Sequence, residues 1–179
     1  GRLAAIRATD GIQLWEKPIS TIKGTTELEK LMDSDSPAIA FNDIVFAANY
    51  NGSLTRFNIR GGEKVFSVDL STSKPFVLYK DKIIAVSSDD EIIAFDAING
   101  SEIWKNSKFK FRGLTPPTIY DNFLYFGDIE GYLHKLNPET GDIIGLEETK
   151  LNAVTQIEAY ANKLFAQDVA GSVYVFEIK

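Results

Sequence analysis

The sequence predicts an all-β protein, a β-propeller built from four-stranded antiparallel blades. Two observations support this prediction. One strand pattern recurs at a spacing of about 40 residues, which is the length of one propeller blade. Apolar side chains also alternate onto both faces of the recurring strand, so each sheet is expected to lie between similar sheets. The rival architecture, a solenoid, usually has shorter repeats that contain helices or single strands.

The repeat is visible when the chain is set against itself. The recurring segments are GRLAAIRATDGIQLW from residue 1, GSLTRFNIRGGEKVF from 52, DEIIAFDAINGSEIW from 90, GYLHKLNPETGDIIG from 131 and GSVYVFEIK from 171. Asn, Asp and Gly separate short strands within each repeat, as tight turns require. We therefore expect one partial propeller, with a partial blade over 1–20, an inserted loop over 20–37, full blades over 37–70, 75–108 and 115–150, and a three-stranded last blade over 153–179.

The third strand of each repeat carries apolar side chains at two positions, three residues apart. Counted from the leading Gly or Asp, the first position holds Leu3, Leu54, Ile92, Leu133 and Val173, and the second holds Ile6, Phe57, Phe95, Leu136 and Phe176. An odd offset places the two positions on opposite faces of a strand. We therefore expect both faces of each sheet to be buried.

A glycine and, four residues later, an aromatic residue mark the passage from the third strand to the fourth. The aromatic residues are Trp15, Phe66 and Trp104, and we interpret them as structural rings that lie across the neighbouring blade. Burying one such ring removes roughly 150 Å² or more of apolar surface from water and contributes on the order of 3 kcal/mol. The fourth repeat has Gly145 at this position, so we expect one blade junction to pack differently.

Composition limits the partners. The chain has 179 residues, 44% of them hydrophobic, which is enough to form one core. Its net charge is −6, and it lacks the clustered cations that binding to a nucleic-acid backbone requires. A basic partner surface suits it better. It has no cysteine and no apolar run near the roughly 18 residues that span a bilayer. Because the sequence begins at Gly1 in the middle of a repeat, we expect it to be a trimmed chain or a fragment.

Few residues offer the chemistry of a catalytic site. Asn58, Asp96 and Asn137 recur at matching places in successive repeats, but turn capping also produces such recurrence, so we interpret them as structural. The only histidine, His134, occupies a position that holds Ala, Thr, Ile or Tyr in the other repeats, which again indicates a structural role. Serine–histidine and metal–histidine chemistry then lack their central residue. We predict no catalytic residue, no metal site and no cofactor.

The inserted loop, STIKGTTELEKLMDSDSP, exceeds what a turn requires, and such loops often carry binding residues. We expect a short helix within TELEKLM. An EF-hand loop counted from Asp33 would have Pro37 at its fifth position, Ala38 where glycine is required and Ile44 where the bidentate glutamate belongs, so the loop does not predict a calcium site.

The frame A-x-x-x-x-G-x-x-x-W resembles the tryptophan-docking repeat of pyrroloquinoline-quinone propellers over nearly the whole chain. That repeat is shared by enzymes and non-enzymes. The ordered segments GTTELEKLMDSDSPAI, ANYNGSLTRFN, RGLTPPTIYDNFLYFGDIEGYLHKLNPETG and GSVYVFEIK resemble, more specifically, the C-terminal half of the BamB family. These are lipoprotein subunits of the bacterial outer-membrane β-barrel assembly machinery.

The resemblance implies about half of an eight-bladed ring that an N-terminal strand would close, so the fragment is expected to pair with another chain or to self-associate. It implies a non-catalytic scaffold at the periplasmic face of the outer membrane, held by a lipid on a missing N-terminus. In this family an Asp-x-Asp in the inserted loop meets a POTRA domain of the barrel-forming subunit, and here the match falls on Asp33 and Asp35. Unfolded outer-membrane proteins are a further implied partner.

Two other functions stay open on the sequence alone. One is half of a quinoprotein-like dehydrogenase, which needs a central metal, carboxylate and amide ligands and an aspartate base. The other is a propeller that binds a peptide or solute in its central funnel. Exposed edge strands are also candidates for the addition of a strand from a partner.

Overall fold

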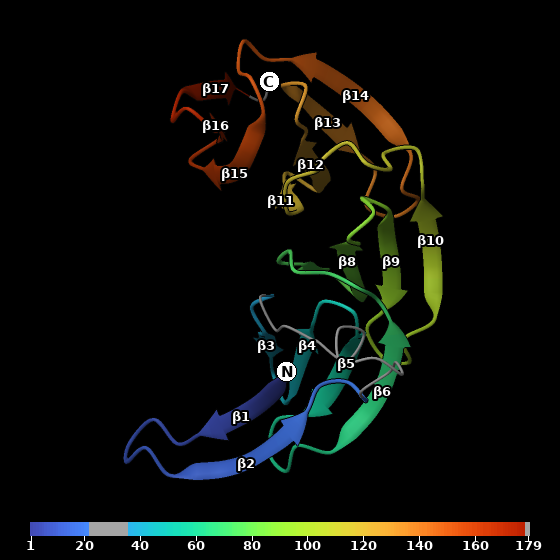
Figure 1. The fold of residues 1–179 in the computed structure, drawn as a ribbon, viewed down its shortest axis with the longest axis vertical. Helices are drawn as coiled ribbons and strands as arrows, with labels where there is room; N and C mark the ends of the chain where they lie inside the picture. The colour runs from blue at the N-terminus through green and yellow to red at the C-terminus, as the bar shows by residue number, and fades with distance from the viewer. Residues whose placement is uncertain (22–35, 178–179) are drawn as a thin grey trace. The chain divides into compact units, whose positions relative to one another are not determined.

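The computed structural model describes residues 1–21 and 36–177, and these residues form β-strands and turns without a helix (Figure 1). The expectation of an all-β chain is therefore confirmed. The helix expected within TELEKLM lies outside the described residues. The chain divides into two compact units, Gly1–Lys74 with Ile98–Gly100, and Pro75–Ala97 with Ser101–Lys179.

The first unit contains a two-stranded and a four-stranded sheet. Its strands are β1 (Arg2–Ile6), β2 (Gln13–Pro18), β3 (Ile39–Phe41), β4 (Ile44–Ala48), β5 (Ser53–Asn58) and β6 (Lys64–Asp69). β1 pairs with β2, and the other four pair in chain order, each antiparallel to the next. The two sheets share a core in which Trp15 and Ile19 meet Val45, Ala47 and Phe57.

The second unit contains two four-stranded sheets and one three-stranded sheet, each antiparallel and paired in chain order. Its strands are β7 (Val77–Tyr79), β8 (Lys82–Val86), β9 (Ile92–Asp96), β10 (Glu102–Asn106), β11 (Thr118–Tyr120), β12 (Phe123–Gly127), β13 (Tyr132–Leu136), β14 (Ile143–Glu148), β15 (Val154–Tyr160), β16 (Lys163–Asp168) and β17 (Val173–Glu177).

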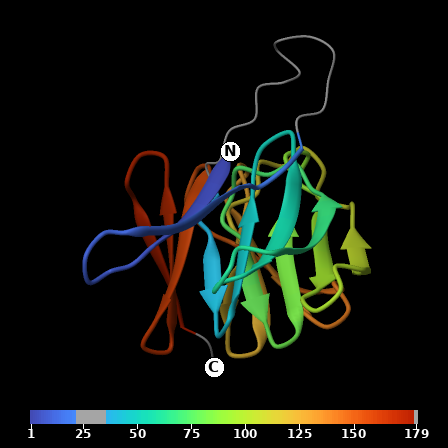
Figure 2. The same ribbon diagram turned by 90° about the horizontal axis from the view of Figure 1, so that it is seen from below.

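The three sheets of the second unit lie side by side (Figure 1, Figure 2), and two apolar cores hold them together. The first core joins the β7–β10 sheet to the β11–β14 sheet and includes Ile84, Val86, Ile92, Leu124, Phe126 and Leu136. The second joins the β11–β14 sheet to the β15–β17 sheet and includes Tyr125, Leu133, Val154, Ile157 and Leu164. The middle sheet is therefore covered on both faces, as the alternating pattern predicted.

Burial of both predicted positions is confirmed in the four-stranded sheets and wrong in the two smaller ones. In β5, β9 and β13 the two positions are buried. Ile6 of β1 is instead 62% exposed and Val173 of β17 is 57% exposed. The apolar cores that these two smaller sheets share with their neighbours do not include Ile6 or Val173.

A register shift recurs where the third and fourth strands of a sheet separate. It falls at Ala5/Ile6 in β1, at Arg56/Phe57 in β5 and at Lys135/Leu136 in β13, and β10 has its shift at Glu102/Trp104 opposite β9. An extra residue at such a bulge increases the local twist of the strands. The bulge thus lies between the turn glycine and the predicted docking ring in the first three repeats, and between Gly141 and Gly145 in the fourth.

Candidate functional site

The two aspartates predicted to bind a partner, Asp33 and Asp35, lie outside the described residues. Ser20 and Ser36, near the two ends of the inserted loop, are buried and hydrogen-bonded. Ser20 Oγ donates to Asn49 Oδ1 over 2.6 Å, and Ser36 Oγ donates to the carbonyl of Lys74 over 2.9 Å. The inserted loop therefore starts and ends at fixed points of the first unit.

Trp15 and Trp104 have equivalent surroundings in their two units. The Nε1–H of Trp15 donates to the Ile59 carbonyl over 2.8 Å, and that of Trp104 donates to the Pro138 carbonyl over 3.1 Å. Both acceptors lie in the turn of the following repeat. Each indole thus buries its apolar face and satisfies its single polar group, as buried tryptophans require.

The three predicted rings each cover a glycine in the turn of the next repeat. A Cβ atom placed on Gly62 would lie 2.6 Å from the Trp15 ring, one on Gly100 would lie 2.7 Å from the Phe66 ring, and one on Gly141 would lie 2.5 Å from the Trp104 ring. All three glycines have a positive φ, between 69° and 79°. Glycine is therefore required at this position for two reasons: only glycine adopts this backbone conformation without strain, and a side chain would block the approach of the ring.

Gly145 stands where a fourth ring would be expected. A cavity of about 130 Å³ lies beside it, lined by Tyr125, Leu133, Lys135, Leu146, Glu147 and Phe176. This junction therefore lacks the ring contact found at the other three.

The most connected polar side chain is Asp128, which directly follows β12 and is fully buried. Its Oδ2 accepts two hydrogen bonds from Arg112, at 2.9 Å from Nε and 2.7 Å from Nη2, and one from His134 Nε2 at 2.8 Å. Its Oδ1 accepts the backbone N–H groups of Glu130 and Tyr132 over 2.9 and 3.0 Å. Both oxygens are fully engaged, so the carboxylate is an anchor and has no free lone pair directed at a substrate.

The charge of Asp128 is maintained by these donors. Burial opposes ionisation, but the hydrogen bonds from His134, from the Tyr132 amide and from Arg112 outweigh it and lower the pKa of the carboxyl below its usual value. The same contacts raise the pKa of the Arg112 guanidinium, chiefly through its hydrogen bonds to Asp128. The pair is charged over the whole neutral range.

Asp128 belongs to a recurring set that the sequence analysis missed. In each sheet of three or four strands, a polar residue at the end of the second strand, or directly after it, accepts the backbone N–H four positions later. The set comprises Asn49, Ser87, Asp128 and Asp168. A small polar residue at a fixed distance before the third strand is the signal that aligned repeats would have revealed, because such side chains cap turns.

His134 has a structural role in this arrangement. It is 6% exposed, and its ring packs edge-on against the ring of Phe109 with 4.9 Å between the ring centroids. Its Nε2–H donates a hydrogen bond to Asp128. It therefore joins β13 to the segment between β10 and β11. The structure brings it together with none of the other residues that the sequence offered as candidate ligands.

Asn58, Asp96 and Asn137 lie at equivalent turns between third and fourth strands. Their backbone N–H groups donate to the carbonyls of Glu63, Ser101 and Asp142 respectively, over 2.8 to 2.9 Å. The side chain of Asn137 also accepts the N–H of Glu139 over 2.9 Å. These contacts are those of turn residues, as the sequence analysis interpreted them.

Residues 1–21 and 36–177 hold neither a metal-binding cluster nor a membrane-spanning helix. In that part of the chain, no group of three or more His, Cys, Asp or Glu side chains is placed to hold a metal ion. The described residues also contain no helix long and apolar enough to span a membrane.

The family model and the curated relatives that match this chain belong to the same family. The family model described as outer membrane protein assembly factor BamB matches residues 1–106. The protein of that name from Escherichia coli (strain K12) is 33% identical over 175 residues, which are 97% of this chain and 45% of the relative. The chain thus spans about half the length of the curated relatives it matches.

Solved structures agree with the sequence comparison. The structure of BamB from Moraxella catarrhalis matches with a TM-score of 0.89 and 31% identity, and the match covers 99% of this chain and 53% of the other. The quinohemoprotein alcohol dehydrogenase from Comamonas testosteroni matches with a TM-score of 0.56 and 17% identity, over 66% of this chain and 21% of that one. The second likeness concerns the fold alone.

These matches confirm the β-propeller prediction, because the repeated four-stranded sheets superpose on a protein of that fold. The match of the family model extends over more than half of the chain, and the relatives align with nearly all of it. The chain belongs to the family of outer membrane protein assembly factor BamB.

Proposed function

We propose that the protein is a non-catalytic interaction subunit that serves the assembly of outer-membrane β-barrel proteins from the periplasmic face of the outer membrane. The observation that carries this proposal is the family match, which unites sequence and structure over nearly the full chain. A lipid outside the 179 residues would hold it at the membrane. Unfolded outer-membrane proteins are proposed as a second class of partner.

The polar chemistry of the described residues supports a scaffold. The buried carboxylate of Asp128 accepts hydrogen bonds from His134 and Arg112, and the carboxylate of Asp168 accepts hydrogen bonds from backbone N–H groups. Catalytic groups need a free lone pair or proton within reach of a substrate. Here these groups are used to join strands to one another.

The proposed partner is a POTRA domain of the barrel-forming assembly subunit, contacted by Asp33 and Asp35. The net charge of −6 favours a basic partner surface. An exposed pair between one aspartate and a lysine or arginine is worth about 0.2 to 1 kcal/mol, and more if water is excluded at the centre of the interface. Ser20 and Ser36, both buried, fix the two ends from which the loop extends.

The test is a calorimetric titration of the POTRA domain with the full-length protein. The double substitution Asp33→Arg, Asp35→Arg should weaken binding by roughly tenfold or more, because two attractions become repulsions. The matched control is Asp43→Arg, Asp89→Arg, which makes the same change of charge at two exposed turn positions. Equal affinity of the wild type and the Asp33, Asp35 variant would refute the assignment of these residues.

A separate measurement distinguishes the scaffold from a quinoprotein dehydrogenase. An enzyme of that class should show quenched tryptophan fluorescence on addition of an oxidised quinone with calcium, and should reduce a dye in the presence of an alcohol or sugar. We expect neither result. Dye reduction that depends on the quinone would overturn the proposed function.

A further inference from the structure

β14 is an edge strand of its sheet, and some of its backbone N–H and C=O groups point away from the sheet. Among the strands that the structure describes, its only neighbour is β13. Thr149 N donates to Gly131 O over 3.0 Å immediately after the last residue pair. Because hydrogen-bonded pairs alternate along an antiparallel ladder, Gly145 and Glu147 face β13. Leu146 and Glu148 therefore direct their N–H and C=O groups away from the sheet.

The edge is unusually apolar for an outermost strand. Ile143, Ile144 and Leu146 are 42%, 49% and 60% exposed. β6 and β10 are the fourth strands of the other two four-stranded sheets, and each has one exposed large apolar residue, Val65 and Ile103 respectively. Edge strands are normally protected by charged side chains, and an open apolar edge is a template for pairing with another chain.

One face of this edge has space for a ring. The cavity beside Gly145 measures about 130 Å³, and its lining includes Tyr125, Leu133 and Phe176 as well as Lys135, Leu146 and Glu147. An apolar cavity of roughly 150 Å³ is known to accept a benzene molecule. A strand paired with β14 would place the side chain opposite Gly145 on this face, and an aromatic ring packs well over an edge glycine.

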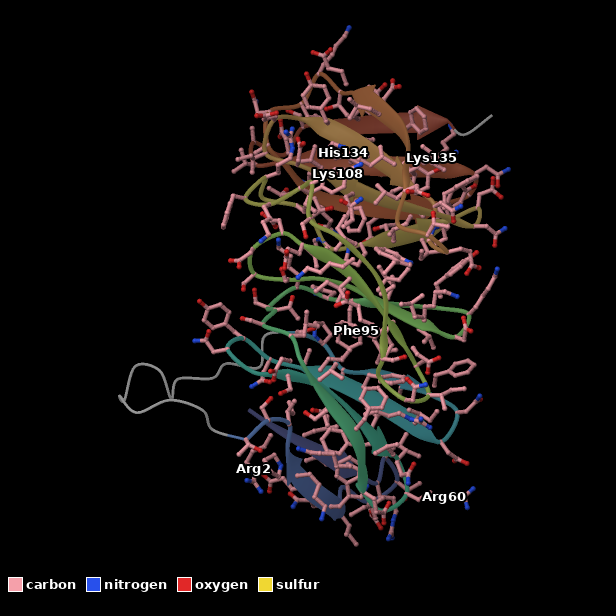
Figure 3. The ribbon with its side chains drawn as sticks, turned by 90° about the vertical axis from the view of Figure 1, so that its right-hand side faces the viewer. Arg2, Arg60, Phe95, Lys108, His134 and Lys135 are labelled. Carbon is pink, nitrogen blue, oxygen red and sulfur yellow. The ribbon has the colours of Figure 1, made fainter. Side chains whose placement is uncertain are left out.

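The other face carries an available cation. The lining of a wider cavity of about 390 Å³ includes Ile143 and Leu146 of β14 together with Lys108, Arg112, Glu130 and His134. Figure 3 labels Lys108 and His134. Arg112 is neutralised by Asp128 and Glu130. Lys108 forms no ion pair with another described residue, so its ammonium group is free to attract a carboxylate.

We propose that the open edge of β14 binds an extended segment of another protein as an added β-strand. An aromatic side chain of that segment occupies the cavity beside Gly145, and an acidic side chain next to it in sequence meets Lys108, because neighbouring residues of a strand point to opposite faces. Main-chain hydrogen bonds to Leu146 and Glu148 supply the affinity, and the two side chains supply the specificity. This proposal does not rest on the proposed function.

The probe is a labelled peptide of about eight residues, long enough to cover β14, with alternating Thr and Val and a central Phe–Asp pair. Its anisotropy is measured against the full-length protein. Replacing Phe by Ala should weaken binding by roughly tenfold, because one ring is no longer buried. N-methylation of the backbone groups that face β14 should abolish binding, because the main-chain donors are lost.

Two protein variants test the two faces. Gly145→Phe fills the cavity from within and should reduce binding of the Phe peptide to the level of the Ala peptide. Lys108→Glu alters an exposed side chain and should weaken the Phe–Asp peptide while strengthening a Phe–Lys peptide, by several-fold in each case. Lys17→Glu on β2 is the matched charge control and should leave both affinities unchanged. Circular dichroism establishes that each variant is folded.

Several results would overturn the proposal. They are absence of binding by the wild type, equal binding of the N-methylated peptide, and equal response of the two peptides to Lys108→Glu. Sedimentation that shows a dimer disrupted by Gly145→Phe would assign the edge to a second copy instead. A structure of the full-length protein with its own segment in the Gly145 cavity would also refute a partner strand.

Discussion

The hydrogen-bonded cluster around Asp128 offers the sharpest test of how the second unit is held together. In Asp128→Asn the remaining oxygen can still accept the N–H groups of Glu130 and Tyr132. The new amide nitrogen, however, faces three N–H donors, two from Arg112 and one from His134. The substitution therefore retains the turn and removes the contacts between segments.

The expected loss of stability is about 3 kcal/mol. Removing one partner of a buried ion pair costs roughly 3 to 5 kcal/mol, because the other partner stays desolvated. The lower end applies here because the Arg112 side chain is 34% exposed and can recover part of its hydration. His134 is buried and loses its acceptor without gaining water.

The matched control is Asp168→Asn at the equivalent turn of the β15–β17 sheet. There Oδ1 accepts Ala170 N and Ser172 N, and the other oxygen meets only Asn152 N at 3.5 Å. The control should lose less than half as much stability as Asp128→Asn in urea denaturation followed by fluorescence and circular dichroism. Equal losses would show that Arg112 and His134 contribute nothing beyond the turn.

The pH dependence gives an independent check of the same cluster. The pKa of Asp128 is lowered in the folded protein, so its stabilising effect is fully present above the unfolded pKa of about 3.8 and is lost as the pH falls through the lower folded value. Asp128→Asn should therefore flatten the decline of stability below about pH 4. An unchanged acid slope would contradict the assigned role of the carboxylate.

Three further predictions concern other parts of the second unit. Gly141→Ala and Gly171→Ala both place a side chain at a positive φ, but only the side chain at position 141 meets an indole, that of Trp104. Gly141→Ala should therefore lower the free energy of unfolding by about 1 to 2 kcal/mol more than Gly171→Ala, as measured by thermal or urea unfolding. Equal losses would contradict the ring contact. The buried hydroxyl of Tyr125 has no hydrogen-bond partner among residues 1–21 and 36–177, and its burial raises the pKa to about 12. Tyr125→Phe should therefore be neutral or stabilising by about 1 kcal/mol at pH 7 and should remove a loss of stability between pH 10 and 12, whereas clear destabilisation would reveal a missing partner. A hydrogen bond from Lys105 lowers the pKa of Glu91 to about 2, so the stability due to this pair should decline from about pH 4.5 down to pH 2, and Lys105→Met should remove much of that decline.

The repeat and its turn chemistry could be predicted because they follow from local rules. A positive φ at a turn selects glycine, and alternation along a strand selects which faces are apolar. Trp15 and Trp104 stood out because a large ring recurs at a fixed distance from such a glycine. The sequence could not show that Ile6 and Val173 are exposed, since their burial depends on whether a second sheet covers them.

The partners of Asp128 could not be predicted for a similar reason. Arg112 lies 16 positions earlier and His134 six positions later, on elements whose approach depends on how two sheets pack. The local sequence around Lys108 does not indicate that its ammonium group lies beside the open edge of β14. That neighbourhood is created by the stacking of the β7–β10 and β11–β14 sheets.

The sequence by itself determined the all-β class, the repeat, the turn glycines and the rings that cover them, because each depends on backbone conformation and on a spacing of a few residues. The tertiary structure alone decided which faces are covered, which buried charges are compensated, and where a missing ring leaves a cavity beside Gly145. These depend on contacts between sheets. Burial and electrostatic free energies are set by the whole surroundings of a side chain, which residues distant in sequence provide.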